Sequence, residues 1–323
     1  MGEVKADSRR DEKIKAADKV EIVILVDNYI DLLLPDQLPF AIRPPLSTGA
    51  DIPKGTFLAE HGLSLFINIY ADKNYRILFD TGYTEVCIKN NMQRLKVKEE
   101  DLDAIVISHF HMDHTGGLKE VLKGCKDKIP IFVHPDAFIY PRYMQLPDKR
   151  KLIFPKTLVK EELIEMGVDV VETKEPTLIC NRFALITGEI ERSCPFEKGM
   201  PNLVLERDGR IEKDLILDDQ ALVVLIKEKG LVVISGCAHS GIINTISYAK
   251  KITGIDSIYA VLGGFHLSGH IFEPAIEPTL SELKKMDIEV LVPMHCTGWK
   301  AIKRMSELFS SFILSSVGTK IVL

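Results

Sequence analysis

The sequence predicts a mixed α/β protein, and two patterns in it support this fold class. The first is a recurring unit of apolar strand, polar loop and amphipathic helix along most of the 323 residues. The second is that histidines cluster where the predicted strands end. No tandem repeat is visible, and 46% hydrophobic residues can bury a large core, so one large domain is the expected organisation.

Apolar runs and turn residues predict the elements of the first half of the chain. Residues 1–19 alternate acids and bases, and we predict them to be a flexible N-terminal arm. Residues 28–60 contain five prolines together with apolar clusters, so this insertion is expected to pack across the mouth of a site. The predicted strands are 20–26, 63–70, 75–79, 102–108 and 130–133, and the predicted helices are 85–95 and 118–122.

The second half continues the same alternation. Residues 139–156 are rich in cations and aromatic side chains, which fits either a lid that binds substrate or a solvated loop. Residues 189–202 are expected to form a substrate loop. The predicted helices are 158–166, 242–252, 279–286 and 301–309. The predicted strands are 168–171, 177–179, 183–187, 203–207, 210–211, 221–226, 231–234, 258–262 and 290–292, followed by two short C-terminal strands.

One stretch after a buried strand carries the chemistry. His109 and His111 are two positions apart, so in an extended backbone they point the same way. The adjacent Asp113 and His114 diverge and can reach a second ion. Imidazole with one carboxylate suits zinc best, with iron or manganese as alternatives. The loop therefore predicts two divalent metal ions per chain, rather than histidines that only cap the next helix.

Composition excludes several classes of partner. The net charge of −5 provides no positive field to recruit nucleic acid or an anionic membrane. No apolar run reaches about 18 residues, and the N-terminus lacks the apolar core of a signal peptide. Six cysteines without paired spacing indicate reduced thiols. A cytoplasmic protein is expected, and a homo-oligomer is compatible with the sequence.

The metal loop also carries a family resemblance. Residues 109–114 resemble the HxHxDH signature of the metallo-β-lactamase fold superfamily. Further motifs resemble the branch named after 7,8-dihydropterin-6-methyl-4-(β-D-ribofuranosyl)aminobenzene-5'-phosphate synthase, and they lie at residues 60–64, 78–82, 235–242, 263–267 and 295–298. The resemblance implies a four-layer αββα sandwich that forms a single domain over residues 20–323.

The resemblance also implies further metal ligands. Many superfamily hydrolases place a histidine in a Thr-Pro-Gly-His context, where this chain has residues 187–189, Thr-Gly-Glu. We therefore expect His239 to supply the missing ligand, and His295 to supply the last ligand of the second ion. Cys237 stands where many relatives carry an aspartate that bridges both metals. Its thiolate is a candidate ligand, and a buried small hydrophobe is the alternative.

Asp113, His266 and Asp80 are the predicted catalytic residues. Asp80 ends a predicted strand and would accept the ring N–H of a ligand histidine, with a turn-forming role as the alternative. His266 follows two glycines and is expected to act as an acid or base near the metals, with a hydrogen bond at a helix entry as the alternative. The candidate residues for an anionic substrate are His61, Arg43, Arg142 and Arg192.

Two enzymatic functions follow from the resemblance. In the first, two metals hold the pyrophosphate of a dihydropterin methyl diphosphate while an aryl amine or its ring attacks the methylene carbon, a step of methanopterin biosynthesis. In the second, a generic hydrolase cleaves a phosphoester, ester or lactone with metal-bridged hydroxide. A redox protein without hydrolytic chemistry is disfavoured, because His111 stands where di-iron flavoproteins usually carry glutamate. The expected partner is a small anionic, phosphorylated substrate.

Overall fold

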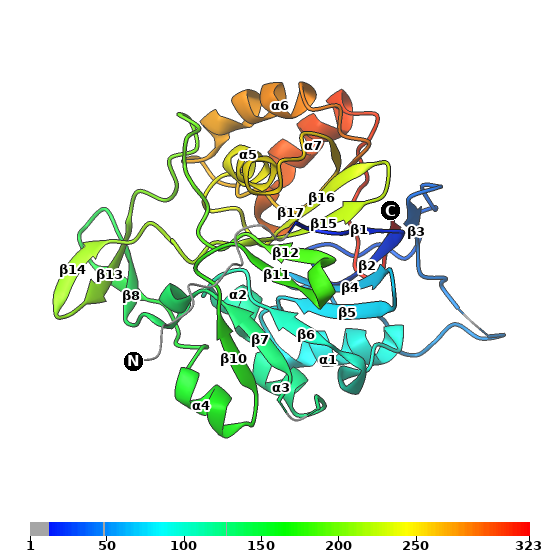
Figure 1. Ribbon diagram of the computed structural model, residues 1–323, viewed down its shortest axis with the longest axis horizontal. Coiled ribbons are helices and arrows are strands. Elements are labelled where there is room, and N and C mark those ends of the chain that lie inside the picture. The colour runs from blue at the N-terminus through cyan, green and yellow to red at the C-terminus, as the bar shows by residue number, and fades with distance from the viewer. Residues whose placement is uncertain (1–12, 48, 127) are drawn as a thin grey trace, which may run out of the picture.

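Two β-sheets pack face to face, and helices cover both outer surfaces (Figure 1). The computed structural model describes residues 13–323 apart from residues 48 and 127, so most of the predicted N-terminal arm lies outside the described residues. The predicted α/β class and its four-layer αββα arrangement are confirmed by this architecture.

The first sheet has eight strands. Its strands, in pairing order, are β10 (Asp169–Glu172), β7 (Pro130–Val133), β6 (Ala104–Val106), β5 (Asn74–Phe79), β4 (Ser64–Tyr70), β2 (Lys19–Val26), β19 (Lys320–Val322) and β3 (Ala41–Ile42). Strands β5, β6 and β7 run parallel. Because parallel strands end at the same edge, Asp80 after β5 meets the metal loop after β6.

The second sheet has seven strands. Its main path is β11 (Thr177–Ile179), β12 (Ala184–Ile186), β15 (Ala221–Ile226), β16 (Gly230–Ser235), β17 (Ile258–Gly264) and β18 (Val290–Met294). The remaining strand, β1 (Ala16–Ala17), pairs with β15. Strands β16, β17 and β18 are parallel, so the loops that carry His239, His266 and His295 leave one edge of this sheet.

Helices form the two outer layers. Those against the first sheet are α1 (Glu85–Leu95), α3 (Leu118–Leu122) and α4 (Lys160–Glu165), and those against the second are α5 (Ile242–Thr253), α6 (Ile276–Lys284) and α7 (Trp299–Leu308) (Figure 1). The short helix α2 (Met112–Thr115) belongs to the loop after β6 and lies where the two sheets end. Helix α1 has its predicted bounds, because Thr84 caps it by accepting from the amide of Cys87 and Lys96 ends it in a left-handed conformation. Among the described residues, no helix is long and apolar enough to span a membrane.

Three apolar layers hold the sandwich together. Ile77 faces the gap between the sheets, where it joins Ile67 and Val232, while the next residue, Leu78, faces the helices. On the far side, Val233 packs with α5 and α6. Since both faces of the central strands are buried, these strands are continuous apolar runs rather than alternating ones.

The structure corrects three of the predicted elements. Residues 16–17 pair with β15 and Ala17 is fully buried, so the N-terminal arm does not extend to residue 19. Residues 139–156 are not a simple lid or loop, because they form a hairpin, β8 (Arg142–Gln145) and β9 (Lys151–Ile153). That hairpin joins β13 (Leu203–Arg207) and β14 (Arg210–Lys213) in a separate four-stranded sheet. At the C-terminus one of the two predicted strands is reduced to a single bridge at Phe312.

Candidate metal centre

Loops from both sheets converge at one end of the sandwich. Four non-glycine residues of these loops have left-handed backbone conformations: Asp80 (φ 58°), Ala238 (φ 53°), His266 (φ 46°) and His295 (φ 50°). Such conformations are uncommon for residues with a side chain and persist only where the surroundings enforce them. All four lie in loops that carry or adjoin the clustered histidines, so the packing of this edge holds them in place.

The first cluster consists of three imidazoles. His109 Nε2 lies 2.9 Å from His111 Nδ1 and 3.2 Å from His239 Nε2, and the last two nitrogens are 3.1 Å apart. Tetrahedral ligands about 2.0–2.1 Å from a zinc ion are roughly 3.3 Å from one another. The three nitrogens therefore have the spacing of one face of a metal coordination shell, which accounts for three ring nitrogens in such close contact.

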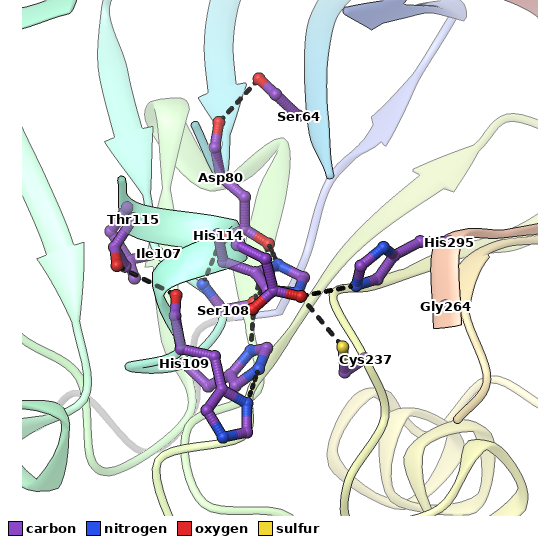
Figure 2. Close-up of polar contacts among 12 residues, drawn as sticks. Ser64, Asp80, Ile107, Ser108, His109, His114, Thr115, Cys237, Gly264 and His295 are labelled. Carbon is purple, nitrogen blue, oxygen red and sulfur yellow. Dashed lines mark hydrogen bonds and ion pairs between the residues drawn. The ribbon is translucent and has the colours of Figure 1, made fainter. Parts of the chain in front are cut away.

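A chain of hydrogen bonds sets the orientation of His109 (Figure 2). Asp80 accepts from the Ser108 amide at 2.7 Å and from the Ser108 hydroxyl at 2.7 Å. Because that hydroxyl donates to a carboxylate, its lone pair accepts from His109 Nδ1–H at 2.8 Å. The lone pair of His109 Nε2 consequently points to the centre of the cluster.

Protonation in this cluster suits a metal. Burial lowers the pKa of His111 to about 3 and places those of His109 and His239 well below the usual value. All three rings are therefore neutral at pH 7, and neutral imidazole is the form that ligates metals.

The second cluster is mixed and consists of a carboxylate, two imidazoles and a thiol. Asp113 Oδ2 lies 3.1 Å from His295 Nε2 and 3.8 Å from His114 Nε2, and Cys237 Sγ lies 3.1 Å from His114 Nε2. All four ligand atoms lie within 4.8 Å of one another. This set of nitrogen, oxygen and sulfur donors is suited to zinc and to other first-row transition metals.

Buried acceptors orient the two imidazoles of the second cluster. His114 Nδ1–H donates to Asp80 Oδ2 at 2.6 Å, and His295 Nδ1–H donates to Asn28 Oδ1 at 3.0 Å. The amide of His295 donates to Asp27 at 2.8 Å. Burial opposes the charged form of His114, but Asp80 and Asp113 raise its pKa to about 9, so a metal ion bound at this cluster would displace the proton from Nε2. Asp80 is fully buried behind His114 and is thus a positioning residue rather than one that contacts substrate.

Gly236 allows this close packing. A Cβ atom at this position would lie 2.0 Å from Ser108 Oγ and 3.1 Å from Asp80 Oδ2. Any side chain here would therefore displace the hydrogen bonds that orient His109, so glycine is required before Cys237.

The two other predicted histidines lie beside the clusters. His266 forms a third group with Cys237 and His239, and its Nδ1 is buried without a hydrogen-bond partner. His61 Nε2 is 3.5 Å from Asp113 Oδ2, and its side chain is 64% exposed. His266 thus lies beside both clusters, and His61 lies at the mouth of the site.

A cavity of about 780 Å³ opens directly onto both clusters. Its walls are mainly apolar and aromatic, with Phe154, the residue after β9, and the exposed Trp299 at its edge. Of the 28–60 insertion, only Asn28 and Tyr29 line this cavity among the described residues. No lysine or arginine lines it within the described part of the chain.

The structure places none of the three predicted arginines in this cavity. Arg43 donates to Thr319 Oγ1 at 2.7 Å and to the Leu314 carbonyl at 2.8 Å. Arg192 donates to the carbonyls of Leu215 and Ile216. Both guanidinium groups donate to carbonyl and hydroxyl oxygens of the fold, and neither residue lines this cavity.

Arg142 has a structural role instead. Its guanidinium lies 2.8 Å from Asp218 Oδ1 and 3.5 Å from Asp214 Oδ2, and it stacks 3.9 Å above the centre of the Phe110 ring. Asp218 also accepts from the Phe110 amide at 2.8 Å, within the metal loop. Asp218 thus links Arg142 to the metal loop, and the ion pair stabilises the conformation of that loop.

We expect Arg142→Met to destabilise the protein by about 3–5 kcal/mol, because it leaves Asp218 buried without its cation. Urea unfolding of the variant measures this loss. Arg150→Met is the matched control on the same hairpin, since the Arg150 side chain is 75% exposed. Equal stabilities of the two variants would contradict the structural role.

Sequence reasoning did not identify Glu197, whose carboxylate supports the His239 loop. Helix α5 begins after Gly241, which has no side chain to cap it, and Glu197 accepts from the amides of Ile243 and Asn244 at 2.8 Å each. A glutamate 46 residues upstream gives no local sign of this role.

The raised pKa of Glu197 predicts that the free energy of unfolding depends on pH. Burial raises the pKa of Glu197 from 4.5 to about 7, against the two amides, which lower it. Between these values the folded protein binds a proton that the unfolded chain has released, so the free energy of unfolding falls as pH rises across this window and is constant above it. Urea unfolding at pH 5 and pH 8 should show this decline in the wild type and a smaller decline in Glu197→Gln. Parallel profiles would contradict it.

Comparisons with known proteins agree with this geometry. Residues 60–180 match the family described as the metallo-β-lactamase superfamily. The chain is 36% identical over 262 residues to the 7,8-dihydropterin-6-methyl-4-(β-D-ribofuranosyl)-aminobenzene-5'-phosphate synthase of Methanocaldococcus jannaschii, covering 78% of this chain and 86% of the relative. It is 35% identical over 266 residues to the uncharacterised protein MJ0448 of the same organism, covering 81% and 93%.

Solved structures support the fold. The crystal structure of Tm1679, described as a metal-dependent hydrolase of the β-lactamase superfamily, aligns with a TM-score of 0.69 at 25% identity, covering 93% of this chain and 98% of that one. The metallo-β-lactamase fold protein YhfI from Bacillus subtilis aligns with a TM-score of 0.50 at 12% identity, covering 95% and 100%.

Proposed function

Because the chain belongs to the metallo-β-lactamase superfamily, we propose that it is a dinuclear metal enzyme that acts on a small pyrophosphorylated substrate. The product named for the M. jannaschii synthase joins a dihydropterin methyl group to an aminobenzene that carries a ribose phosphate. We propose that this chain forms the same bond, with His109, His111 and His239 holding one ion and Asp113, His114, Cys237 and His295 holding the other.

The chemistry of the 780 Å³ cavity carries the proposal. Its apolar and aromatic walls suit a flat heterocycle, and no cationic side chain among its described lining residues competes with the ions for the diphosphate. When bound, the ions supply positive charge that stabilises the departing diphosphate. Because the ions would supply the positive charge and the walls the apolar contacts, the cavity needs no arginine, which is consistent with the contacts of Arg43, Arg142 and Arg192 elsewhere in the fold.

The residues of the chain position the reacting groups. Trp299 and Phe154 enclose the ring, and Asp80 and Asn28 hold His114 and His295 in place. A bond forms between the amine nitrogen and the methylene carbon as the bond from that carbon to the diphosphate oxygen breaks and its electron pair leaves with the diphosphate. The amine proton passes to the imidazole of His266, which lines this cavity.

An assay of diphosphate release tests this function. Metal-loaded protein is given a dihydropterin methyl diphosphate with and without the aryl amine phosphate, and a generic phosphodiester in parallel. Release that requires the amine, together with formation of the coupled product, is the expected result. Release or cleavage at the same rate without the amine would contradict the synthase.

Hydrolysis is the second candidate, and the similarity to Tm1679, a described metal-dependent hydrolase, favours it. The same clusters suit attack by water on a phosphoester, ester or lactone. A hydrolase would cleave the phosphodiester, and its rate of release would not depend on the amine. The assay above therefore separates the two functions.

A further inference from the structure

We propose that a second cavity, behind His239 and His266, is the binding site of the nucleophilic substrate, an aryl amine that carries a phosphate group. This inference rests on the proposed synthase function and assigns a site to its second substrate. The cavity has a volume of about 640 Å³ and lies between the loop 195–201 and the loop 265–275. Its size is that of a small-molecule site.

The two cavities meet at the metal centre. His239 and His266 line both of them, and the two rings are 4.2 Å apart. The ring of His266 is also held edge to face by Phe272 at 4.5 Å, in the wall of the second cavity. Because these two residues belong to both linings, ligands in the two cavities would meet at the same imidazoles, as a reaction between two substrates requires. A hydrolase needs only water in the second position.

The walls of the second cavity suit an aromatic ring. Phe265 and Leu267 are buried at its base, and Phe196 and Phe272 are partly exposed beside them. Offset or edge-to-face contacts with such rings favour a benzene ring over a sugar or a peptide. Polar side chains are few, so the walls provide shape rather than hydrogen bonds.

The rim of the second cavity carries the positive charge that the first lacks. Lys198 and Lys213 line it, and both residues are exposed. Among the described residues neither ammonium makes a hydrogen bond or an ion pair, so both are available to a phosphate. The carboxylate of Glu197, the acid in this lining, is turned to the amides of α5. Apolar walls with two free lysines at the rim fit an aryl compound with a phosphate at its far end.

The test is the double variant Lys198→Gln/Lys213→Gln. We expect its KM for the aryl amine phosphate, and the Kd of that compound measured by calorimetry, to rise about 10-fold. Metal content and the KM for the pterin diphosphate should not change. An aryl amine without phosphate should bind the variant and the wild type equally. Lys149→Gln/Lys284→Gln is the matched control, because both of its lysines are exposed and line neither cavity.

A steric variant provides an independent test. Ile271 lies at the same rim and is 43% exposed, so Ile271→Trp can fill the opening without disturbing the core. It should weaken binding of the aryl amine with or without its phosphate. Amine-dependent turnover that both variants leave unchanged would overturn the second site and leave the synthase intact. A wild type whose turnover ignores the amine would overturn both.

Discussion

Replacing His239 with alanine is expected to remove about one metal ion per chain and to lower turnover at least about 10³-fold. The first cluster would retain only His109 and His111 as ligands. Among the described residues, none of residues 187–189, Thr-Gly-Glu, belongs to a candidate metal group that could replace it. Elemental analysis and steady-state kinetics on the same preparation measure both effects.

The matched control for this variant is His270→Ala. His270 lies on the neighbouring loop, is exposed and belongs to none of the candidate metal groups among the described residues. Its replacement should leave metal content and turnover unchanged. A His239→Ala protein with the metal content and activity of the wild type would show that His239 is not a ligand.

The second large effect is expected from Asp80→Asn. Asparagine keeps the shape of the side chain and tolerates the left-handed backbone at φ 58°, but it cannot accept all three hydrogen bonds from Ser108 and His114. We expect the affinity for metal to fall about 10–100-fold, because the ligand rings lose their orientation. The free energy of unfolding should fall by about 1–3 kcal/mol, since a buried donor or acceptor is left unpaired.

Metal titration and urea unfolding of the apoprotein measure these two effects of Asp80→Asn separately. Asp101→Asn is the control, because Asp101 makes only a partly exposed ion pair with Arg76. If Asp80→Asn binds metal as tightly as the control, the hydrogen-bond chain from Asp80 is not what orients His109 and His114.

The metal loop is the part of the site that sequence predicts best. The spacing of His109, His111, Asp113 and His114 is local, so the extended backbone of the first two residues and the helix α2 that holds the last two divide these side chains between the two clusters. The bounds of α1 are predictable for the same reason, because Thr84 and Lys96 act within one turn of its ends. Local backbone rules need no knowledge of the rest of the fold.

The supporting residues are not predictable in this way. In the sequence Arg142 is one cation in a polar loop. Its role comes from its contact with Asp218, 76 residues later. Asn28 follows a strand, and nothing near it in the sequence indicates a role. Its side chain accepts a hydrogen bond from His295, which is 267 residues away. The hairpin of β8 and β9 likewise depends on its pairing with β13. Tertiary contacts decide the role of each, so propensity and periodicity cannot assign it.

Elemental analysis of the purified, metal-loaded wild type measures whether each of the two clusters holds a metal ion. We predict about two ions per chain, falling to about one in His239→Ala. Less than one ion per wild-type chain after loading with zinc, iron or manganese would contradict the metal centre and the functions built on it.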